Sequence, residues 1–220
     1  MTDAIDWTPI RAAYLDAQLA GDRRRAVSLV ADLLRDDAVD RSAVRSRVIR
    51  EAQREIGRLW QENTISIAQE HVATAISQLA LAEVYRHEPP TDRNGLKIVV
   101  ACVDGELHDM PARLVADELD VAGFDVRYLG ASVPTHTLLS FLAAQRPHLV
   151  VLSATMAFHA DAVRDAVRRI RADWGPALPI AIGGQVCEWI GNLGSELDVQ
   201  FAGCDVAELL EVASRVAGRP

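Results

Sequence analysis

Three polar side chains with the capacity for metal chemistry stand close together at Glu106, His108 and Asp109. They follow an apolar run at 96–102, which predicts a buried strand, and they precede a helical pattern that begins near Pro111. In open α/β sheets, ligands bind at the carboxyl ends of the strands. A histidine two residues after a carboxylate can offer one ring nitrogen to a metal while a carboxylate holds the other. From this stretch alone, a solvated loop histidine beside two acids is the competing interpretation.

Two further loops predicted at the same edge carry groups suited to ligand binding. Ser153 and Thr155 follow a third apolar run, and their hydroxyls can bond a polar ligand tail or cap the next helix. Gly183 and Gly184 follow a fourth run, where paired glycines permit close approach to a flat ligand, a positive φ or an ordinary turn. Together with the metal-capable histidine, these loops predict a pocket for a large ligand that has a metal centre and an extended tail.

The elements that position these loops alternate between strand and helix. Strands are expected at 96–102, 125–130, 148–153, 178–182 and 199–202. Helices are expected at 109–122, 135–145, 159–173, 186–194 and 206–217. This alternation predicts an α/β fold, namely a flavodoxin-like five-stranded parallel sheet in the order 2-1-3-4-5 with helices on both faces. His136 and His159 also fall near the carboxyl edge, where we expect each to be a surface residue.

The first part of the chain predicts a small antiparallel bundle of four helices. Apolar stripes indicate two helices within 7–35 and a third over about 41–61. Ser66 and Gln69 have capping-box spacing, so a fourth helix is expected to start there and to continue to about residue 86. The apolar stripe of this last helix comprises Val72, Ile76 and Leu79.

A polar segment at 88–95 separates the two parts. Its prolines at 89 and 90 forbid helix continuation. We therefore expect a helical-bundle domain over 1–88 and an α/β domain over 95–220.

Composition and charge narrow the functional classes. The 220 residues are 50% hydrophobic and 25% charged, and no apolar run approaches the roughly 20 residues of a membrane span. The N-terminus shows no secretion signal, so we expect a cytoplasmic protein that binds no membrane. The net charge of −8 disfavours direct binding to nucleic acid, and we interpret the arginines between 41 and 58 as a solvated helix face. The three cysteines, at 102, 187 and 204, are interpreted as buried thiols.

The α/β part resembles the cobalamin-binding domain, whose pattern is Asp-x-His-x-x-Gly, then Ser-x-Leu or Ser-x-Thr, then Gly-Gly. This sequence has Glu-Leu-His-Asp-Met-Pro at 106–111, Ser-Ala-Thr at 153–155 and Gly-Gly at 183–184. The resemblance implies that His108 replaces the cofactor's own base as the lower cobalt ligand and that Glu106 orients it. It also implies that the displaced nucleotide tail runs beside the other two motifs. The cofactor-binding residues of this domain are then Glu106, His108, Asp109, Ser153, Thr155, Gly183 and Gly184.

Two departures from the family pattern affect the first motif. Glu106 replaces the aspartate, which lengthens the arm that carries the carboxylate. Pro111 replaces the glycine, which stiffens the start of the following helix. Neither departure removes the ligating histidine.

The bundle resembles that of light-sensing adenosylcobalamin proteins of the CarH/LitR type, which carry Trp-x9-Glu-His. Here Trp60 and Glu70-His71 have this spacing, and the helix break at 62–65 places them at an elbow. The resemblance implies that Trp60 covers the upper corrin face and that Glu70 accepts hydrogen bonds from the adenosyl group. A core tryptophan beside a solvated Glu-His pair is the alternative. Gln61 stands where those photoreceptors have a second cobalt-ligating histidine, so His71 is the remaining candidate for that role.

These resemblances imply a cobalamin-binding sensor or photoreceptor, not an enzyme. Adenosylcobalamin would be held base-off and His-on between the bundle and the α/β domain, and light or ligand loss would rearrange the two. The related transcription regulators carry a DNA-binding domain ahead of the bundle. Because this sequence begins at the bundle, we expect its signal to pass through self-association or a protein partner.

A corrinoid methyl carrier of a methyltransferase system is the alternative function. Such carriers share the architecture but are not expected to carry the Trp-x9-Glu-His pattern. A radical mutase is disfavoured, because 220 residues cannot supply a substrate barrel beside both domains.

Overall fold

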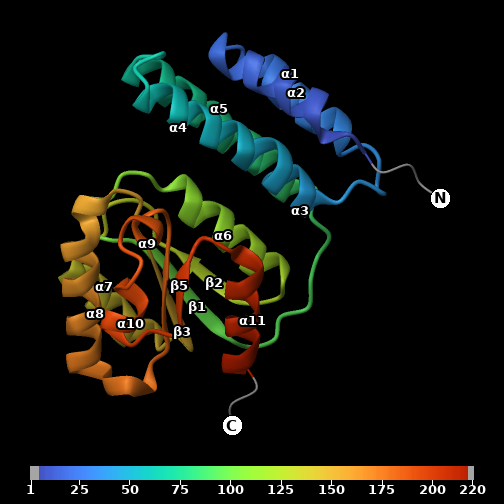
Figure 1. The fold of residues 1–220 in the computed structure, drawn as a ribbon. Helices are drawn as coiled ribbons and strands as arrows, with labels where there is room; N and C mark the ends of the chain where they lie inside the picture. The colour runs from blue at the N-terminus through green and yellow to red at the C-terminus, as the bar shows by residue number, and fades with distance from the viewer. Residues whose placement is uncertain (1–4, 218–220) are drawn as a thin grey trace. The chain divides into compact units, whose positions relative to one another are not determined.

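The computed structural model describes residues 5–217, which fold as two compact units. A helical unit ends at Pro89, and an α/β unit begins at Pro90. In Figure 1 the helical unit runs from blue to teal and the α/β unit from green to red. Each unit buries a hydrophobic core of its own.

The described part of the helical unit contains four helical stretches, as predicted. They are α1 (Trp7–Leu19), α2 (Arg23–Leu33), the composite of α3 (Arg41–Ala43), η1 (Val44–Arg50) and α4 (Glu51–Gln61), and α5 (Ile67–Arg86). Each stretch begins at a residue whose side chain accepts a hydrogen bond from a free backbone N–H group of the first turn, namely Asp6, Asp22, Asp40 and Ser66. The apolar periodicity did not predict that η1 is a π-helix.

One arginine of the third stretch is not solvated, contrary to the prediction for 41–58. Arg45 lies in η1, is 1% exposed and forms an ion pair with Glu88 at the end of the helical unit. Arg41 adds a hydrogen bond from its Nε to the carbonyl oxygen of His87 at 2.9 Å. The carboxylate of Glu88 neutralises the buried guanidinium, so Arg45 fastens the end of α5 to η1.

Helix α5 begins with the predicted capping box. The Ser66 and Gln69 side chains each bond the other's backbone N–H. Of the predicted apolar stripe, only Ile76 is buried, while Val72 and Leu79 are exposed. The buried face carries both small and large residues: Ala73, Ile76, Ser77, Ala80, Leu81 and Val84. In the part of the chain that the structure describes, no helix is both long and apolar enough to cross a membrane.

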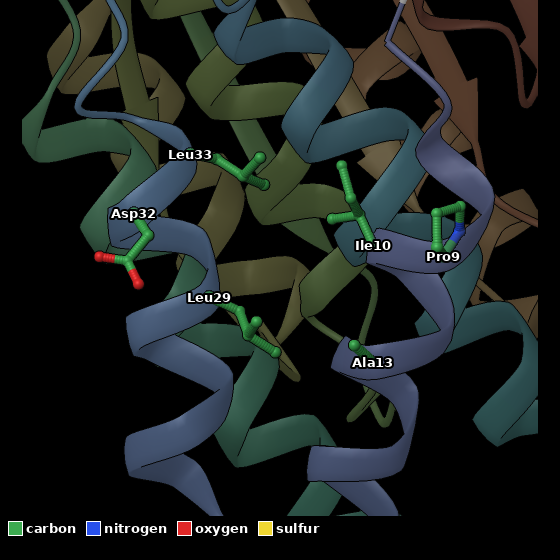
Figure 2. A pocket seen from close by; sticks show the side chains of 6 residues that line it. All are labelled: Pro9, Ile10, Ala13, Leu29, Asp32 and Leu33. Carbon is green, nitrogen blue, oxygen red and sulfur yellow. The ribbon is translucent and has the colours of Figure 1, made fainter.

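A hollow of about 440 Å³ lies between α1 and α2. Figure 2 shows its lining, which comes from the start of one helix and the end of the other: Pro9, Ile10, Ala13, Leu29, Asp32 and Leu33. The lining is apolar apart from one carboxylate and includes no imidazole or thiol. Its one polar group is the Asp32 carboxylate, so the hollow offers mainly apolar surface for packing.

The described part of the α/β unit forms the predicted parallel sheet, with the order β2-β1-β3-β4-β5. The strands are β1 (Lys97–Cys102), β2 (Asp125–Tyr128), β3 (Leu149–Ser153), β4 (Ile180–Gly183) and β5 (Phe201–Gly203). The central strands β1 and β3 are almost continuous apolar runs because both faces of the sheet are covered. The flavodoxin-like prediction is confirmed.

Helices cover both faces of this sheet (Figure 1). On one face, α7 (Thr135–Gln145), α8 (Ala160–Trp174), α9 (Val186–Trp189) and α10 (Leu193–Leu197) pack on alternate strand residues such as Val99 and Leu152. On the other face, α6 (Met110–Val121) and α11 (Val206–Ala217) pack on residues such as Val100 and Val151. The single helix predicted at 186–194 was wrong, because the chain leaves helical geometry at Ile190 and divides it into α9 and α10.

The cysteines differ in their environments. Cys102 at the end of β1 is buried, Cys187 is half-buried and Cys204 is exposed, so the prediction of a buried thiol was wrong for Cys204. Burial raises the pKa of Cys102 and of Cys187 to about 12. These two thiols therefore stay protonated and unreactive at neutral pH.

Candidate cofactor site

The carboxyl ends of four strands are level with one another, which brings the loops that follow them to one edge of the sheet. Cys102 pairs with Ser153, Ser153 with Gly183, and Gly183 with Gly203. The polar residues predicted to bind a ligand after β1, β3 and β4 therefore belong to adjacent loops, as the topology required.

The carboxylate of Glu106 is the centre of this edge. The residue is fully buried. One carboxylate oxygen accepts hydrogen bonds from the backbone N–H of His108 at 2.8 Å and from its ring Nδ1 at 2.5 Å. The other accepts from the backbone N–H of Thr155 at 2.6 Å and from Nδ1 of His159 at 2.9 Å. A single buried side chain thus joins the loop after β1 to the loop after β3.

These hydrogen bonds decide the charge of Glu106. Burial alone would raise its pKa, but the bonds from the His108 side chain, the Thr155 backbone and the His108 backbone outweigh burial and lower the pKa to about 2. Glu106 is therefore a carboxylate at neutral pH and can only accept hydrogen bonds. It follows that both imidazoles donate through Nδ1. When His108 is neutral, its Nε2 then carries the lone pair that a metal can use.

The imidazole of His108 is anchored on its inner side and reaches solvent on its outer side. Its Nδ1 is held by the buried carboxylate, while 44% of the side chain is exposed. Beneath it, the loop is braced by Ser132, whose N–H donates to the Glu106 carbonyl at 2.8 Å and whose hydroxyl accepts from the Gly105 N–H at 3.2 Å. These contacts hold in place the loop that carries His108.

Asp109 makes contacts that are different from those of Glu106. Its side chain accepts a hydrogen bond from the hydroxyl of Tyr128 at 3.1 Å, at the start of α6. Burial raises the pKa of Tyr128, so this hydroxyl stays protonated and donates. Asp109 thus ties α6 to β2, and this contact does not include His108.

The hydroxyl pair after β3 does not cap the next helix. Neither η2 (Ala157–His159) nor α8 has a hydrogen bond from a capping side chain, so the capping alternative is wrong. Ser153 is buried at the end of its strand. The hydroxyl oxygen of Thr155 is buried and has no hydrogen-bond partner within residues 5–217. A buried hydroxyl without a partner is costly in a folded protein, and a polar ligand group can supply the missing bond.

Of the glycine pair at the end of β4, Gly184 is required by the fold itself. Gly184 has a φ of +102°, and a Cβ at this position would lie 2.2 Å from the carbonyl oxygen of Ala154. The Ala154 N–H donates to the Gly183 carbonyl at 3.0 Å. The loops after β3 and β4 therefore pack directly against each other, so the positive φ that was one of the alternatives for this pair is present at Gly184.

His159 is not the surface residue that the sequence predicted. It is 9% exposed, and its ring lies edge-on to Phe158 with the centroids 4.3 Å apart. The periodicity of the following helix gave no sign of this burial, because the partner of His159 is Glu106, 53 residues earlier. His136, the other histidine predicted at the surface, is exposed.

Three large apolar side chains at this edge were also missed. Leu107 is 73% exposed, Phe158 72% and Trp189 62%, and they follow β1, β3 and β4. Single exposed apolar residues are normal on a protein surface, and a contiguous patch of them marks a binding site. Leu107, Phe158 and Trp189 each come within six residues after the end of a strand, near the loops of this edge.

Trp60, the first residue of the motif in the helical unit, lies at the end of α4. It is half-buried and packs against a core cluster that includes Ile56 and Ile65. The chain turns at 62–66 before α5 begins, so the predicted elbow is present. Gln61 is exposed.

Glu70 and His71 form a pair in the first turn of α5. The Glu70 carboxylate accepts from His71 Nδ1 at 2.6 Å and from the Thr74 hydroxyl at 2.6 Å. The side chain of Glu70 is 15% exposed, whereas that of His71 is 71% exposed. Glu70 is thus held by local contacts, while His71 projects into solvent.

Comparison with known families identifies the class of ligand that the chain binds. Residues 96–203 match the model of the B12 binding domain, and residues 10–85 match a second B12 binding domain model. The chain belongs to the B12-binding family. The ligand of this B12-binding protein is therefore a cobalamin or a related corrinoid, and the fold is that of an α/β cobalamin domain with a helical cap domain ahead of it in the chain.

Similar proteins fall into two groups. The chain is 31% identical over 130 residues to the HTH-type transcriptional repressor CarH of Myxococcus xanthus, covering 59% of this chain and 43% of that protein. It is 22% identical over 182 residues to dimethylamine corrinoid protein 1 of Methanosarcina acetivorans, covering 79% and 84%. The chain spans less than half the length of the first curated relatives that it matches. The structure of the Methanosarcina barkeri monomethylamine corrinoid protein has the same fold, with a TM-score of 0.81, 20% identity and coverage of 96% and 100%.

The residues at the sheet edge fit a corrinoid. The corrin ring supplies its own equatorial nitrogens, so the protein needs to provide only one further donor, and His108 offers a single imidazole held through Nδ1. The buried hydroxyl of Thr155 has no partner among the described residues, so a polar tail could supply its hydrogen bond.

Proposed function

We propose that the protein is a sensor that binds adenosylcobalamin base-off, with His108 as the lower cobalt ligand. The observation that supports this role is the hydrogen bond from His108 Nδ1 to the buried, ionised Glu106. Such a carboxylate fixes the tautomer of a metal-bound histidine and raises its basicity. Ser153, Thr155, Gly183 and Gly184 would then line the path of the nucleotide tail, with Asp109 bracing the start of α6.

The helical cap would cover the upper face of the cofactor. Trp60 would shelter the adenosyl group, Glu70 would accept hydrogen bonds from it, and His71 would lie beside them. When bound, adenosylcobalamin supplies a cobalt–carbon bond that light can break. The protein would respond by rearranging cap and α/β unit, with a change in self-association or in a protein partner, and it would catalyse no reaction itself.

A corrinoid methyl carrier is the second candidate. The likeness to the dimethylamine corrinoid proteins covers more of the chain, 72% and 79%, than the likeness to CarH does, at 59%. In that role the same His108 would hold the cobalt, and the partner would be a methyltransferase. The Trp60 and Glu70-His71 pattern favours the sensor, because it matches a cover for a large upper ligand.

Reconstitution in the dark separates the two functions. The full chain is loaded with adenosylcobalamin or with methylcobalamin, and absorption spectra and gel-filtration profiles are recorded before and after green light. For a sensor we expect preferential binding of adenosylcobalamin, an irreversible spectral change and a shift in elution volume. Equal binding of both cofactors with no shift in elution would contradict the sensor and favour the carrier, which a methyl-transfer assay with a thiol acceptor would then test.

A further inference from the structure

The two carboxylate oxygens of Glu106 have different hydrogen-bond partners, and the motif explains the partners of only one oxygen. Its first oxygen holds His108, within the same loop. Its second oxygen is held from a different part of the chain, by the ring of His159 at 2.9 Å and by the Thr155 N–H at 2.6 Å. His159 lies just before α8 and is almost fully buried.

The contacts of the second oxygen affect those of the first, because both oxygens turn together about the last torsion of the glutamate side chain. The last torsion of a glutamate side chain is broad, so a carboxylate held on one oxygen can rotate. Rotation would turn the first oxygen away from His108 Nδ1 and release the imidazole. The longer arm of Glu106, compared with the aspartate of the family pattern, adds one more rotatable bond and increases the need for a second contact.

The ring of His159 lies beside the loop after β1. A Cβ added to Gly105 would lie 3.6 Å from Nε2 of His159, at ordinary contact distance. Phe158 contacts the ring edge-on. Because Glu106 is ionised and only accepts, the Nδ1 of His159 must donate to it.

We propose that His159 is a positioning residue of the cofactor site, whose imidazole fixes the rotation of the Glu106 carboxylate and thereby the direction in which His108 presents Nε2. The inference rests on the proposed role of His108 as the cobalt ligand. It extends the ligand pair to a chain of three side chains, His108, Glu106 and His159.

The test uses the full chain with variants that separate hydrogen bonding from packing. H159F and H159L remove the donor and keep an apolar side chain, whereas H159N retains an N–H near the position of Nδ1. H136F is the matched control, because His136 is an exposed histidine of the same unit. Circular dichroism selects the variants that fold.

The first readout needs no cofactor. Long-range ¹H–¹⁵N correlation spectra of histidine-labelled protein report the tautomer of His108, whose signals are assigned by their loss in H108A. We expect the Nδ1–H tautomer alone in the unmodified chain and in H136F, a mixture of tautomers in H159F and H159L, and recovery in H159N. The second readout is corrinoid affinity, which should fall about tenfold or more in the donor-less variants, as is typical when a contact that orients a metal ligand is lost.

The outcomes separate this inference from the proposed function. Unchanged tautomer and affinity in a folded donor-less variant would overturn the role of His159, and so would equal impairment of H159N and H159F, which indicates packing alone. Failure of both apolar variants to fold leaves the decision to H159N, where a mixed tautomer overturns the inference and a retained Nδ1–H tautomer with retained affinity supports it. If H108A keeps a nitrogen ligand on bound cobalt, the proposed ligand is wrong, while the tautomer readout still reports on His159.

Discussion

The sheet edge of the α/β unit and the elbow of the helical unit are built on opposite principles. At the edge, Glu106 is fully buried and bonded from two loops that are distant in sequence. At the elbow, Glu70 is bonded only by His71 and Thr74, within one turn of its own helix. Long-range contacts fix the first carboxylate, and local contacts fix the second.

This difference indicates that the sheet edge and the elbow have different roles. A group that must hold a metal ligand in one direction benefits from a rigid surrounding that exists before the ligand arrives. A group that must cover a ligand and later release it is better placed on a surface held by few contacts. Substitutions at the edge should therefore lower both the stability of the fold and the affinity for every corrinoid. Substitutions at the elbow should lower only the affinity for adenosylcobalamin.

The largest expected effect is on stability, and a glycine from each unit provides the comparison. G184A should destabilise the α/β unit by about 3 kcal/mol or more, since Gly184 has a positive φ and its added Cβ would lie 2.2 Å from the Ala154 oxygen. G57A, in α4, meets nothing within 4 Å and should stabilise the helical unit by up to about 1 kcal/mol. Urea unfolding measures both. A stable G184A protein would show that the loops after β3 and β4 are not rigid.

The two glutamates provide the next comparison. E106Q should lower the affinity for every corrinoid by about 10- to 100-fold. The glutamine NH₂ group would face an N–H group that now donates a hydrogen bond to the carboxylate, so that bond would be lost. E70Q should leave hydroxocobalamin binding unchanged and weaken only adenosylcobalamin. Titrations followed by absorption give both affinities. Equal losses in the two variants would remove the proposed distinction between edge and elbow.

Acid should destabilise the edge through Glu106. Its pKa is lowered from 4.5 to about 2 in the folded chain, so its contribution to stability is complete above about pH 5 and is lost as pH falls toward 2. The loss should be about 2 kcal/mol in the unmodified chain and absent in E106Q. Urea unfolding of both proteins between pH 6 and pH 3 measures this. Parallel curves would contradict the assignment of a buried, ionised carboxylate.

The smallest effect is expected at the elbow. W60A should reduce adenosylcobalamin affinity only several-fold, because Trp60 is half-buried and in the proposed role is one of several groups that cover the adenosyl group. Methylcobalamin and hydroxocobalamin should bind as before. Competition between the cofactors under dim red light measures the ratio. A loss shared by all three would assign Trp60 to the stability of the cap and not to the upper ligand.

Periodicity and motif spacing predicted most of the fold and the first half of the site. The apolar runs located the five strands, the strand order followed from their alternation with helices, and the Glu106-x-His108 spacing predicted a pair that the structure joins by a hydrogen bond. These features are local in sequence or follow from general topology. The division of α9 from α10 and the π-helix at η1 depend on packing within the fold and left no periodic signal.

The second half of the site could not be predicted for the same reason. His159 is set apart from a surface histidine by a partner 53 residues away, and Arg45 pairs with Glu88, 43 residues later in the chain. One available signal was the position of His159, which follows Ser153 by six residues on the same predicted edge. The large apolar residues Leu107, Phe158 and Trp189 gave a second, since each follows a different strand within six residues.

The identity of the lower cobalt ligand is the central claim, and electron paramagnetic resonance tests it most directly. The protein is loaded with cobalamin in its Co(II) state, with ¹⁵N-labelled histidine and an unlabelled cofactor. We predict superhyperfine splitting from one ¹⁵N nucleus in the unmodified chain and in H71A, and its loss in H108A. A splitting from ¹⁴N would show that the cofactor's own base is still bound, and a ¹⁵N splitting that persists in H108A would assign the ligand to another histidine; either result would contradict the account.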